Sequence, residues 1–252
     1  MTMPLSLPRQ QGAPRPGLSL VSAPPTHASP HGGRPSWVRL HLLRFRWLLA
    51  TRVEPLVKRA LDVMGALVLA PVLGPPALLA AVLVKLTDGG PMLYWQKRVG
   101  RDGRLFDFPK IRSMRLDAER QGRRLRKRNH HASGVTFKMR NDPRITWIGR
   151  IARRLSIDEI PQLWCVLAGD MSLVGPRPAL PSEVRRYTSA DRRRLDVTPG
   201  LTCLWQVKGR GDLPFDKQVQ LDRDYISSRG VMTDLKILLA TVPAVLTGKG
   251  AY

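Results

Sequence analysis

Two adjacent carboxylates, Asp158 and Glu159, are the strongest candidates for a reactive centre in this sequence. They follow Arg153 and Arg154 closely, at the expected start of a helix. A carboxylate held there beside cations stays ionised and can act as a nucleophile, while its neighbour binds a divalent cation or moves protons. A structural alternative stays open: Ser156 and Glu159 fit a capping box, in which the acids only complement the helix dipole.

Basic side chains suited to phosphate occur on both sides of the acidic pair: Lys110, Arg112, Arg153, Arg177 and Arg210. Arg177 is the best candidate because Pro176 and Pro178 fix its backbone and a guanidinium matches phosphate geometry. The alternative for Arg177 is an ordinary exposed loop arginine, and each of these signals is weak when taken separately. The phosphate loop GxxxxGK[ST] and the GxGxxG and GxSxG motifs do not occur, so the chemistries that they indicate have no support.

An apolar segment that could position these residues at a membrane lies upstream of them. Residues 63–84 form 22 consecutive positions without a charge, long enough to span a bilayer. Gly74, Pro75 and Pro76 lie near its middle, and prolines inside a helix remove donors and kink it. Both flanks are basic, which favours both ends on the cytoplasmic side. The pattern therefore predicts a re-entrant helix–break–helix; a plain spanning helix and a buried soluble hairpin are the alternatives.

The strong excess of basic residues indicates a protein that binds a polyanionic partner. Of 252 residues, 42 are Lys or Arg and 19 are Asp or Glu, so the formal net charge is +23. Nucleic acid, an anionic membrane surface or a phosphorylated substrate would each suit that charge. The 43% of apolar residues exclude wholesale disorder, and two cysteines exclude a disulfide scaffold and favour a reducing compartment.

The predicted organisation has three parts. Residues 1–53 are a disordered Pro-rich basic tail with an amphipathic stretch at 37–49, either an interfacial helix or a helix docked on its own domain. Residues 54–90 hold the predicted membrane helix, and 91–252 form a mixed soluble domain. We expect an α+β, mostly helical fold, with strands at 91–96 and 104–108 around a turn at 100–103. The expected helices cover 144–155, 156–168, 181–194, 214–227 and 234–246, with a basic surface helix and loop of unassigned role at 115–131.

Taken together and in this order, these segments resemble the bacterial sugar transferase family, the monotopic polyprenyl-phosphate hexose-1-phosphate transferases. The resemblance covers about residues 56–252. Its motifs are Lys58-Arg-Ala-Leu-Asp62, the Lys110/Arg112 stretch, Asn141–Thr146, the Asp158-Glu159 block, Gly175–Pro178, Pro199-Gly200 and the final Lys249–Tyr252.

The resemblance implies transfer of hexose 1-phosphate from a UDP-sugar to undecaprenyl phosphate, with release of UMP and a need for Mg²⁺. It makes Asp158 the nucleophile and a magnesium ligand, and Glu159 its partner in the dyad. The implied phosphate or nucleotide contacts are Lys110, Arg112, Arg153, Arg177 and Arg210. The family's helix break matches Gly74-Pro75, here followed by Pro76.

Members that initiate exopolysaccharide synthesis are the best match, with UDP-galactose or UDP-glucose as the expected donor. The implied location is the bacterial inner membrane, on anionic phospholipid, with residues 91–252 as a small catalytic domain on the cytoplasmic face. A homodimer is compatible with the sequence, which does not fix the oligomeric state. Pro109 departs from a usual Tyr, Cys165 from a common Asn and Cys203 from a common Gly.

Two other functions compete with this one. The alternative is a non-enzymatic, membrane-anchored protein of polysaccharide assembly. The Asp158-Glu159 pair, which lies within a motif of the family, argues against this alternative. Nucleic-acid binding rests on charge alone, and the apolar segment and the lack of a recognition motif argue against it. We therefore expect no nucleic-acid partner.

Overall fold

The computed structural model describes residues 53–125, 139 and 141–251, together with Trp37 and His41. Contacts divide the chain into Met1–Trp47 and Leu48–Tyr252, and every element named below belongs to the second unit. The predictions for the tail 1–53 and for a helix at 37–49 fall almost wholly outside the described residues.

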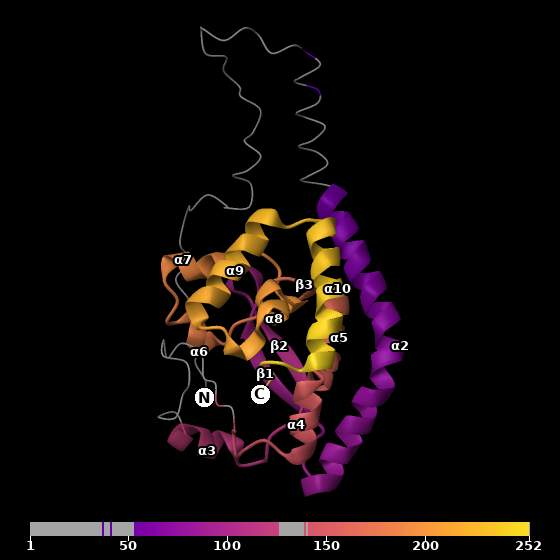
Figure 1. The fold of residues 1–252 in the computed structure, drawn as a ribbon, viewed down its shortest axis with the longest axis vertical. Helices are drawn as coiled ribbons and strands as arrows, with labels where there is room; N and C mark the ends of the chain where they lie inside the picture. Colours follow the sequence, from indigo (N-terminus) through magenta and orange to yellow (C-terminus); the bar gives the residue numbers. More distant parts are fainter. Residues whose placement is uncertain (1–36, 38–40, 42–52, 126–138, 140, 252) are drawn as a thin grey trace. The chain divides into compact units, whose positions relative to one another are not determined.

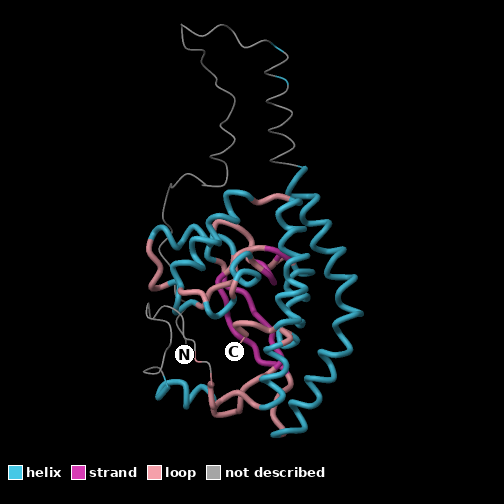
Figure 2. Tube along the Cα trace, viewed as in Figure 1, coloured by secondary structure: helices cyan, strands magenta, loops and turns pink. Residues whose placement is uncertain are grey.

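The second unit is α+β and mostly helical, as predicted (Figure 1). The α-helices are α2 (Glu54–Asp88), α3 (Ala118–Leu125), α4 (Trp147–Arg154), α5 (Leu163–Ala168), α6 (Pro181–Val184), α7 (Ser189–Arg192), α8 (Leu204–Lys208), α9 (Phe215–Ser228) and α10 (Val231–Thr247). The 3₁₀ turns are η2 (Arg101–Gly103), η4 (Ile157–Gln162), η5 (Arg193–Leu195) and η6 (Arg210–Asp212). The strands are β1 (Leu93–Val99), β2 (Leu105–Ile111), β3 (Ser172–Val174) and β4 (Gly200–Thr202). Short helices and loops connect the strands (Figure 2).

Helix α2 is one continuous helix of 35 residues, about 52 Å long at 1.5 Å per residue. It stays helical through Pro71, Pro75 and Pro76, and Figure 1 shows it bent near its middle, so that its two halves run in different directions. The backbone stays helical across Gly74–Pro76, so the two predicted halves form one helix that bends near its middle, without a non-helical gap between them. Each proline removes one backbone donor and its ring crowds the carbonyl of the preceding turn, which bends a helix while the residues on either side stay helical. The re-entrant path through a bilayer stays a prediction.

The two sides of α2 differ in exposure. Small or short side chains face the protein, with Ala66, Ala77, Ala81 and Val84 buried. The other side exposes large apolar residues, namely Leu56, Leu67, Val68, Val72, Leu78, Leu79, Val82, Leu83 and Leu86. By length and composition α2 could cross a membrane, and only 22% of its most apolar window is buried. An exposed apolar stripe of this size on a helix that already has a buried side fits a membrane anchor.

Three polar residues near the start of α2 attach it to the rest of the fold. Arg59 donates to the carbonyl oxygens of Val166 and Leu167 at 2.5 and 2.8 Å, at the end of α5. Asp62 accepts from the backbone N–H of Leu173 at 2.9 Å and from the Ser172 hydroxyl at 3.0 Å. Arg59 and Asp62 therefore fix α5 and β3 against α2.

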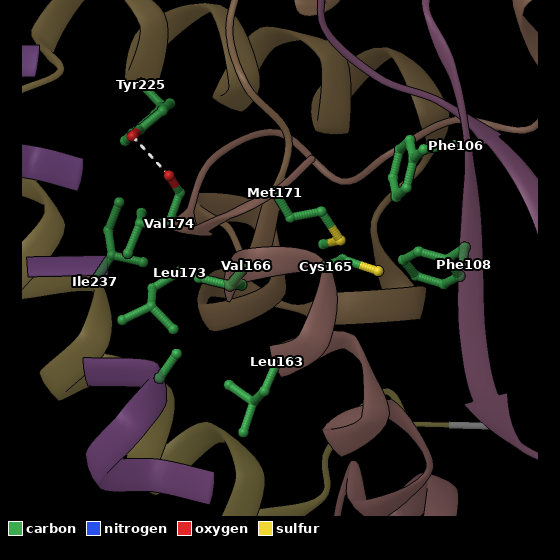
Figure 3. Close-up of a cluster of buried hydrophobic side chains, with 11 residues drawn as sticks. Phe106, Phe108, Leu163, Cys165, Val166, Met171, Leu173, Val174, Tyr225 and Ile237 are labelled. Carbon is green, nitrogen blue, oxygen red and sulfur yellow. Dashed lines mark hydrogen bonds between the residues drawn. The ribbon is translucent and has the colours of Figure 1, made fainter. Parts of the chain in front are cut away.

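Lys58 extends this attachment to two further helices. Its ammonium binds the Asp234 carboxylate of α10 and lies 3.2 Å from the Val174 carbonyl oxygen. The Tyr225 hydroxyl of α9 is 2.9 Å from Asp234 Oδ1 and donates to the same Val174 oxygen at 3.0 Å. Figure 3 shows this last bond at the edge of the main core.

The antiparallel β1–β2 hairpin appears where the turn at 100–103 predicts it. Its register pairs Trp95 with Pro109 and Lys97 with Asp107. The sheet has only two strands, so each strand has an edge that pairs with no other strand, and β2 continues through Pro109. Proline at position 109, where the family usually has tyrosine, therefore does not interrupt strand β2.

The main core lies between α2, β2, α5, β3, α9 and α10 (Figure 3). Its buried side chains are Ala66, Phe106, Phe108, Leu163, Cys165, Val166, Met171, Leu173, Val174, Tyr225 and Ile237. Strands β3 and β4 pair in parallel, which the sequence did not predict. They place the loop that carries Arg177 directly after the core strand β3.

Candidate active site

The acidic pair lies on η4, which follows α4 through a backbone reversal at Ser156. Ser156 has φ 56° and ψ 21°, the left-handed region, and its side chain makes no capping bond. The predicted capping box is therefore wrong. Left-handed backbone at a non-glycine residue costs about 1 kcal/mol and is concentrated at functional sites. Here it turns Asp158 and Glu159 towards β2 and the Arg177 loop.

The other side of η4 packs on α2. Ile157 and Ile160 contact a core cluster that includes Ala77 and Ala81 of α2 and Ile148 of α4. The apolar helix thus directly supports the turn that carries the two acids, level with the segment just after Pro76.

Glu159 is locked between two cations. Arg177 Nη2 lies 2.5 Å from Glu159 Oε1, and Lys110 Nζ lies 3.2 Å from the same oxygen. Burial acts to raise the pKa of Glu159, but the charges and hydrogen bonds of Arg177 and Lys110 outweigh it and hold that pKa well below its ordinary value. Glu159 is therefore a permanent anion whose structural effect is to hold Lys110 and Arg177 together.

Asp158 differs from its neighbour. It is 5% exposed and has no ion pair within the part of the chain that the structure describes. Burial, followed by the negative charge of Glu159, raises the pKa of Asp158, while the charges of Lys110, Arg153 and Arg177 act in the opposite direction. A buried carboxylate that lacks a salt bridge but has cations nearby is suited to attack an electrophile or to bind a cation.

Two cations of the site are held by residues that the sequence did not single out. Arg153 donates from Nε to the Ser113 hydroxyl at 2.8 Å. Lys110 Nζ lies 5.2 Å from the centroid of the Phe108 ring, and burial lowers its pKa to about 8 although Glu159 opposes that shift.

Arg98 is a further cation that sequence reasoning missed. It is buried, donates to the Pro178 carbonyl oxygen at 3.0 Å and lies 5.1 Å from the Phe108 ring centroid. Arg98 thus supports the Arg177 loop from behind. The available signal was weak: a charged residue near the end of a short strand, directly before the hairpin turn.

Arg210 reaches the dyad from η6. Its guanidinium lies 3.2 Å from Ser156 Oγ and 3.5 Å from the Arg154 carbonyl oxygen, beside the residues that precede Asp158. The structure therefore brings together Lys110, Arg153, Arg177 and Arg210 around the two acids.

Arg112 has a different environment from the other predicted phosphate contacts. Its guanidinium binds both carboxylate oxygens of Asp88 and the Pro91 carbonyl oxygen, the latter at 2.7 Å. These bonds join the end of α2 to the end of β2. A substrate contact at Arg112 stays a prediction, and its present partners point to a structural role.

The acids of the site fit a magnesium ion whose remaining ligands are water and substrate phosphates. Within the described ranges, no group of three or more His, Cys, Asp or Glu side chains could enclose a metal ion. Mg²⁺ usually takes one or two carboxylates and completes its shell with water and substrate phosphates. Because Glu159 is bound by two cations, Asp158 is the acid of the pair that fits such an open site.

The two cysteines are not reactive groups. Cys165 and Cys203 are buried and free. Burial raises the thiol pKa of Cys165 to about 11 and that of Cys203 well above its ordinary value, so neither thiolate forms near neutral pH.

Comparison with known proteins gives one consistent family. Residues 53–248 match the family model described as bacterial sugar transferase. The galactosyl transferase CpsE of Streptococcus agalactiae is 46% identical over 197 residues, which cover 78% of this chain and 43% of that protein. The undecaprenyl-phosphate galactose phosphotransferase of Salmonella typhimurium is 40% identical, covering 84% of this chain and 45% of that protein.

A shorter relative aligns over most of its own length. The exopolysaccharide production protein ExoY of Sinorhizobium fredii is 39% identical over 198 residues, which cover 77% of this chain and 88% of that protein. The chain thus spans less than half of the first two relatives and most of the third. Since the family model covers more than three quarters of the sequence, the chain belongs to the bacterial sugar transferase family.

Proposed function

We propose that this protein transfers hexose 1-phosphate from a UDP-hexose to undecaprenyl phosphate and releases UMP. The observation that carries the proposal is the division of roles within the dyad. Glu159 is fixed by Lys110 and Arg177, whereas Asp158 is buried, lacks a salt bridge within the described residues and is surrounded by cations. The activity named for the galactose relative supports it.

The chemistry divides into two displacements. An Asp158 carboxylate oxygen attacks the phosphorus that bears the hexose, the bond from that phosphorus to the bridging oxygen breaks, and UMP leaves with the electron pair. An oxygen of undecaprenyl phosphate then attacks the same phosphorus, the acyl phosphate bond breaks, and the Asp158 carboxylate is restored. No oxidant and no net proton transfer to the protein is needed, and one site serves a soluble donor and a lipid acceptor in turn.

Cationic side chains make the first displacement feasible. The donor's pyrophosphate repels an anionic attacker, and Lys110, Arg153 and Arg177 lower that repulsion while favouring the ionised form of Asp158. Mg²⁺, held by Asp158 together with donor phosphate oxygens, would supply further charge neutralisation at the leaving group.

Helix α2 accounts for access to the lipid. Its exposed apolar side fits a bilayer, and its buried side supports η4 beneath the dyad. We infer a bacterial inner-membrane location with the site on the cytoplasmic face, where the lipid phosphate and UDP-hexoses meet. The reaction would start an exopolysaccharide, and galactose is the first donor to test because three relatives are named for it.

The test uses purified protein in detergent and the donor half-reaction alone. Enzyme with UDP-galactose, and no lipid, should release UMP in a burst near one equivalent of enzyme. Intact-protein mass spectrometry should show one hexose-phosphate adduct, which peptide mapping places on Asp158. UDP-glucose and UDP-N-acetylhexoses run in parallel to identify the sugar.

Asp158→Asn should abolish both the burst and the adduct, with unchanged thermal stability. Asp170→Asn, which neutralises an exposed acid after α5, is the matched control and should behave as wild type. A full reaction without burst or adduct would replace the covalent route by direct attack of the lipid phosphate. Absence of UMP release with every donor, lipid included, would refute the enzymatic function.

A further inference from the structure

Arg210 has a strained backbone that another segment stabilises. Its φ of 49° lies in the left-handed region, which costs a non-glycine residue about 1 kcal/mol or more. The backbone N–H of the next residue, Gly211, donates to the Gly250 carbonyl oxygen at 3.0 Å. A segment that follows α10 is therefore joined to the turn that carries a cation of the site.

The joining segment is a tight turn, residues 248–251, closed by a bond from the Ala251 N–H to the Gly248 carbonyl oxygen at 3.2 Å. Gly250 has φ +70°, and a Cβ there would lie 2.6 Å from the Gly209 carbonyl oxygen and 3.1 Å from Arg210 Cβ. Only glycine allows this approach at this backbone conformation. The turn is thus in direct contact with the backbone on both sides of the Arg210 side chain.

The Arg210 side chain extends from this turn to the dyad. Its guanidinium contacts Ser156 Oγ and the Arg154 carbonyl oxygen, one and three residues from the η4 turn that carries the acids. Gly248 lies on the other side, where a Cβ would meet Arg154 Cγ at 2.6 Å. The 248–251 turn, Arg210 and the end of α4 therefore form one packed unit.

We propose that the 248–251 turn is a positioning element which, through Gly250, holds the Arg210 guanidinium beside the dyad to bind the phosphates of the nucleotide donor. This inference rests on the proposed function, and it assigns a role to the Lys-Gly-Ala segment after α10. Arg210 would contact the donor, and Gly250 would act only through Arg210.

A double-mutant cycle in the steady-state reaction tests the coupling. Arg210→Ala should raise KM for the UDP-hexose about tenfold or more, the loss expected for one charged contact to phosphate, with the KM for undecaprenyl phosphate unchanged. Gly250→Ala should raise the donor KM in the same direction. In the Arg210→Ala background, Gly250→Ala should add no further increase.

Gly103→Ala is the matched control. Gly103 also has a left-handed backbone, with φ +80°, but nothing lies within 4 Å of the added methyl group. It introduces the same local strain in the β1–β2 turn and should leave both KM values at wild type. If Gly250→Ala does not give folded protein, Gly248→Ala perturbs the turn from its other side and replaces it in the cycle.

A second measurement is independent of turnover. Phenylglyoxal should modify Arg210 faster in Gly250→Ala than in Gly103→Ala, as read by peptide mass spectrometry, because the guanidinium is released from Ser156. Additive KM effects together with unchanged Arg210 labelling would overturn the inference. Wild-type protein that releases no UMP would instead refute the proposed function, while the labelling result would still decide whether the turn positions Arg210.

Discussion

Replacing Lys58 by Met should destabilise the protein far more than the same change at an exposed ion pair. Lys58 and Asp234 keep only 29% and 12% of their side-chain surface exposed, and Lys58 also donates to the Val174 carbonyl oxygen. Lys58→Met leaves the Asp234 carboxylate largely buried, with the Tyr225 hydroxyl 2.9 Å from its Oδ1 but without the charge of Lys58. Removing one partner of a buried pair costs about 3–5 kcal/mol, and the remaining exposure of Lys58 places this case near about 2–3 kcal/mol.

A protein of this size loses about 2–4 °C in Tm for each kcal/mol of lost stability, so we expect Tm to fall by about 5–10 °C. Thermal unfolding in detergent, monitored by intrinsic tryptophan fluorescence, measures this change. Lys97→Met is the control: Lys97 pairs with Asp107, but their side chains are 61% and 57% exposed, and the change in Tm should stay within about 2 °C. Adding Asp234→Leu to Lys58→Met should restore most of the loss, because it removes the unpaired charge. A Tm for Lys58→Met equal to that of Lys97→Met would refute the reasoning, as would a double variant less stable than Lys58→Met.

Three further changes test the site and its support. Lys110 has a pKa of about 8 and loses its charge above that pH, so kcat/KM for the donor should fall above pH 8. Lys110→Arg should remove most of this fall, because arginine keeps its charge. A wild-type kcat/KM that stays constant up to pH 9.5 would contradict the role of Lys110. Ala81→Leu should overpack the contact between α2 and η4, cost about 1–3 kcal/mol and lower donor turnover, whereas Val82→Leu on the exposed side of α2 should do neither. Asp62→Ala should cost about 2–4 kcal/mol because it strands the Leu173 N–H, and Asp62→Asn should cost less because its amide oxygen still accepts that bond; equal Tm values for the two would count against the bond to Leu173.

Local signals predicted much of the fold. The turn residues at 100–103 gave the β1–β2 hairpin, and apolar periodicity gave α9 and α10 within three residues of their observed starts. These elements are decided by residues close in sequence, so a single sequence contains the necessary information. Strands β3 and β4 are three residues long each and exist because they pair with each other, which no local pattern indicates.

The site shows the same division. The acids and most of their cations could be selected from residue type and family resemblance, but their partners could not. Ser156 looked like a helix cap and instead adopts a left-handed turn, because the packing of η4 on α2 outweighs local capping. Arg112 looked like its neighbour Lys110, yet the end of α2 places Asp88 beside it. In α2 itself, the prolines predicted a kink between two halves, and the structure has one helix that bends near its middle and stays helical throughout.

The attachment of α2 also sets an order of events during synthesis. Leu173 follows Asp62 by 111 residues, and Asp234 follows Lys58 by 176. At about 5–20 residues per second, a ribosome needs roughly 10–35 s to make the partners of a helix that has already emerged. Throughout that interval Lys58, Arg59 and Asp62 lie at the end of an apolar helix before the residues that bind them exist. The unit can therefore complete its core only after α2 and these later segments have all been made, and a chain without α2 would lack part of that core.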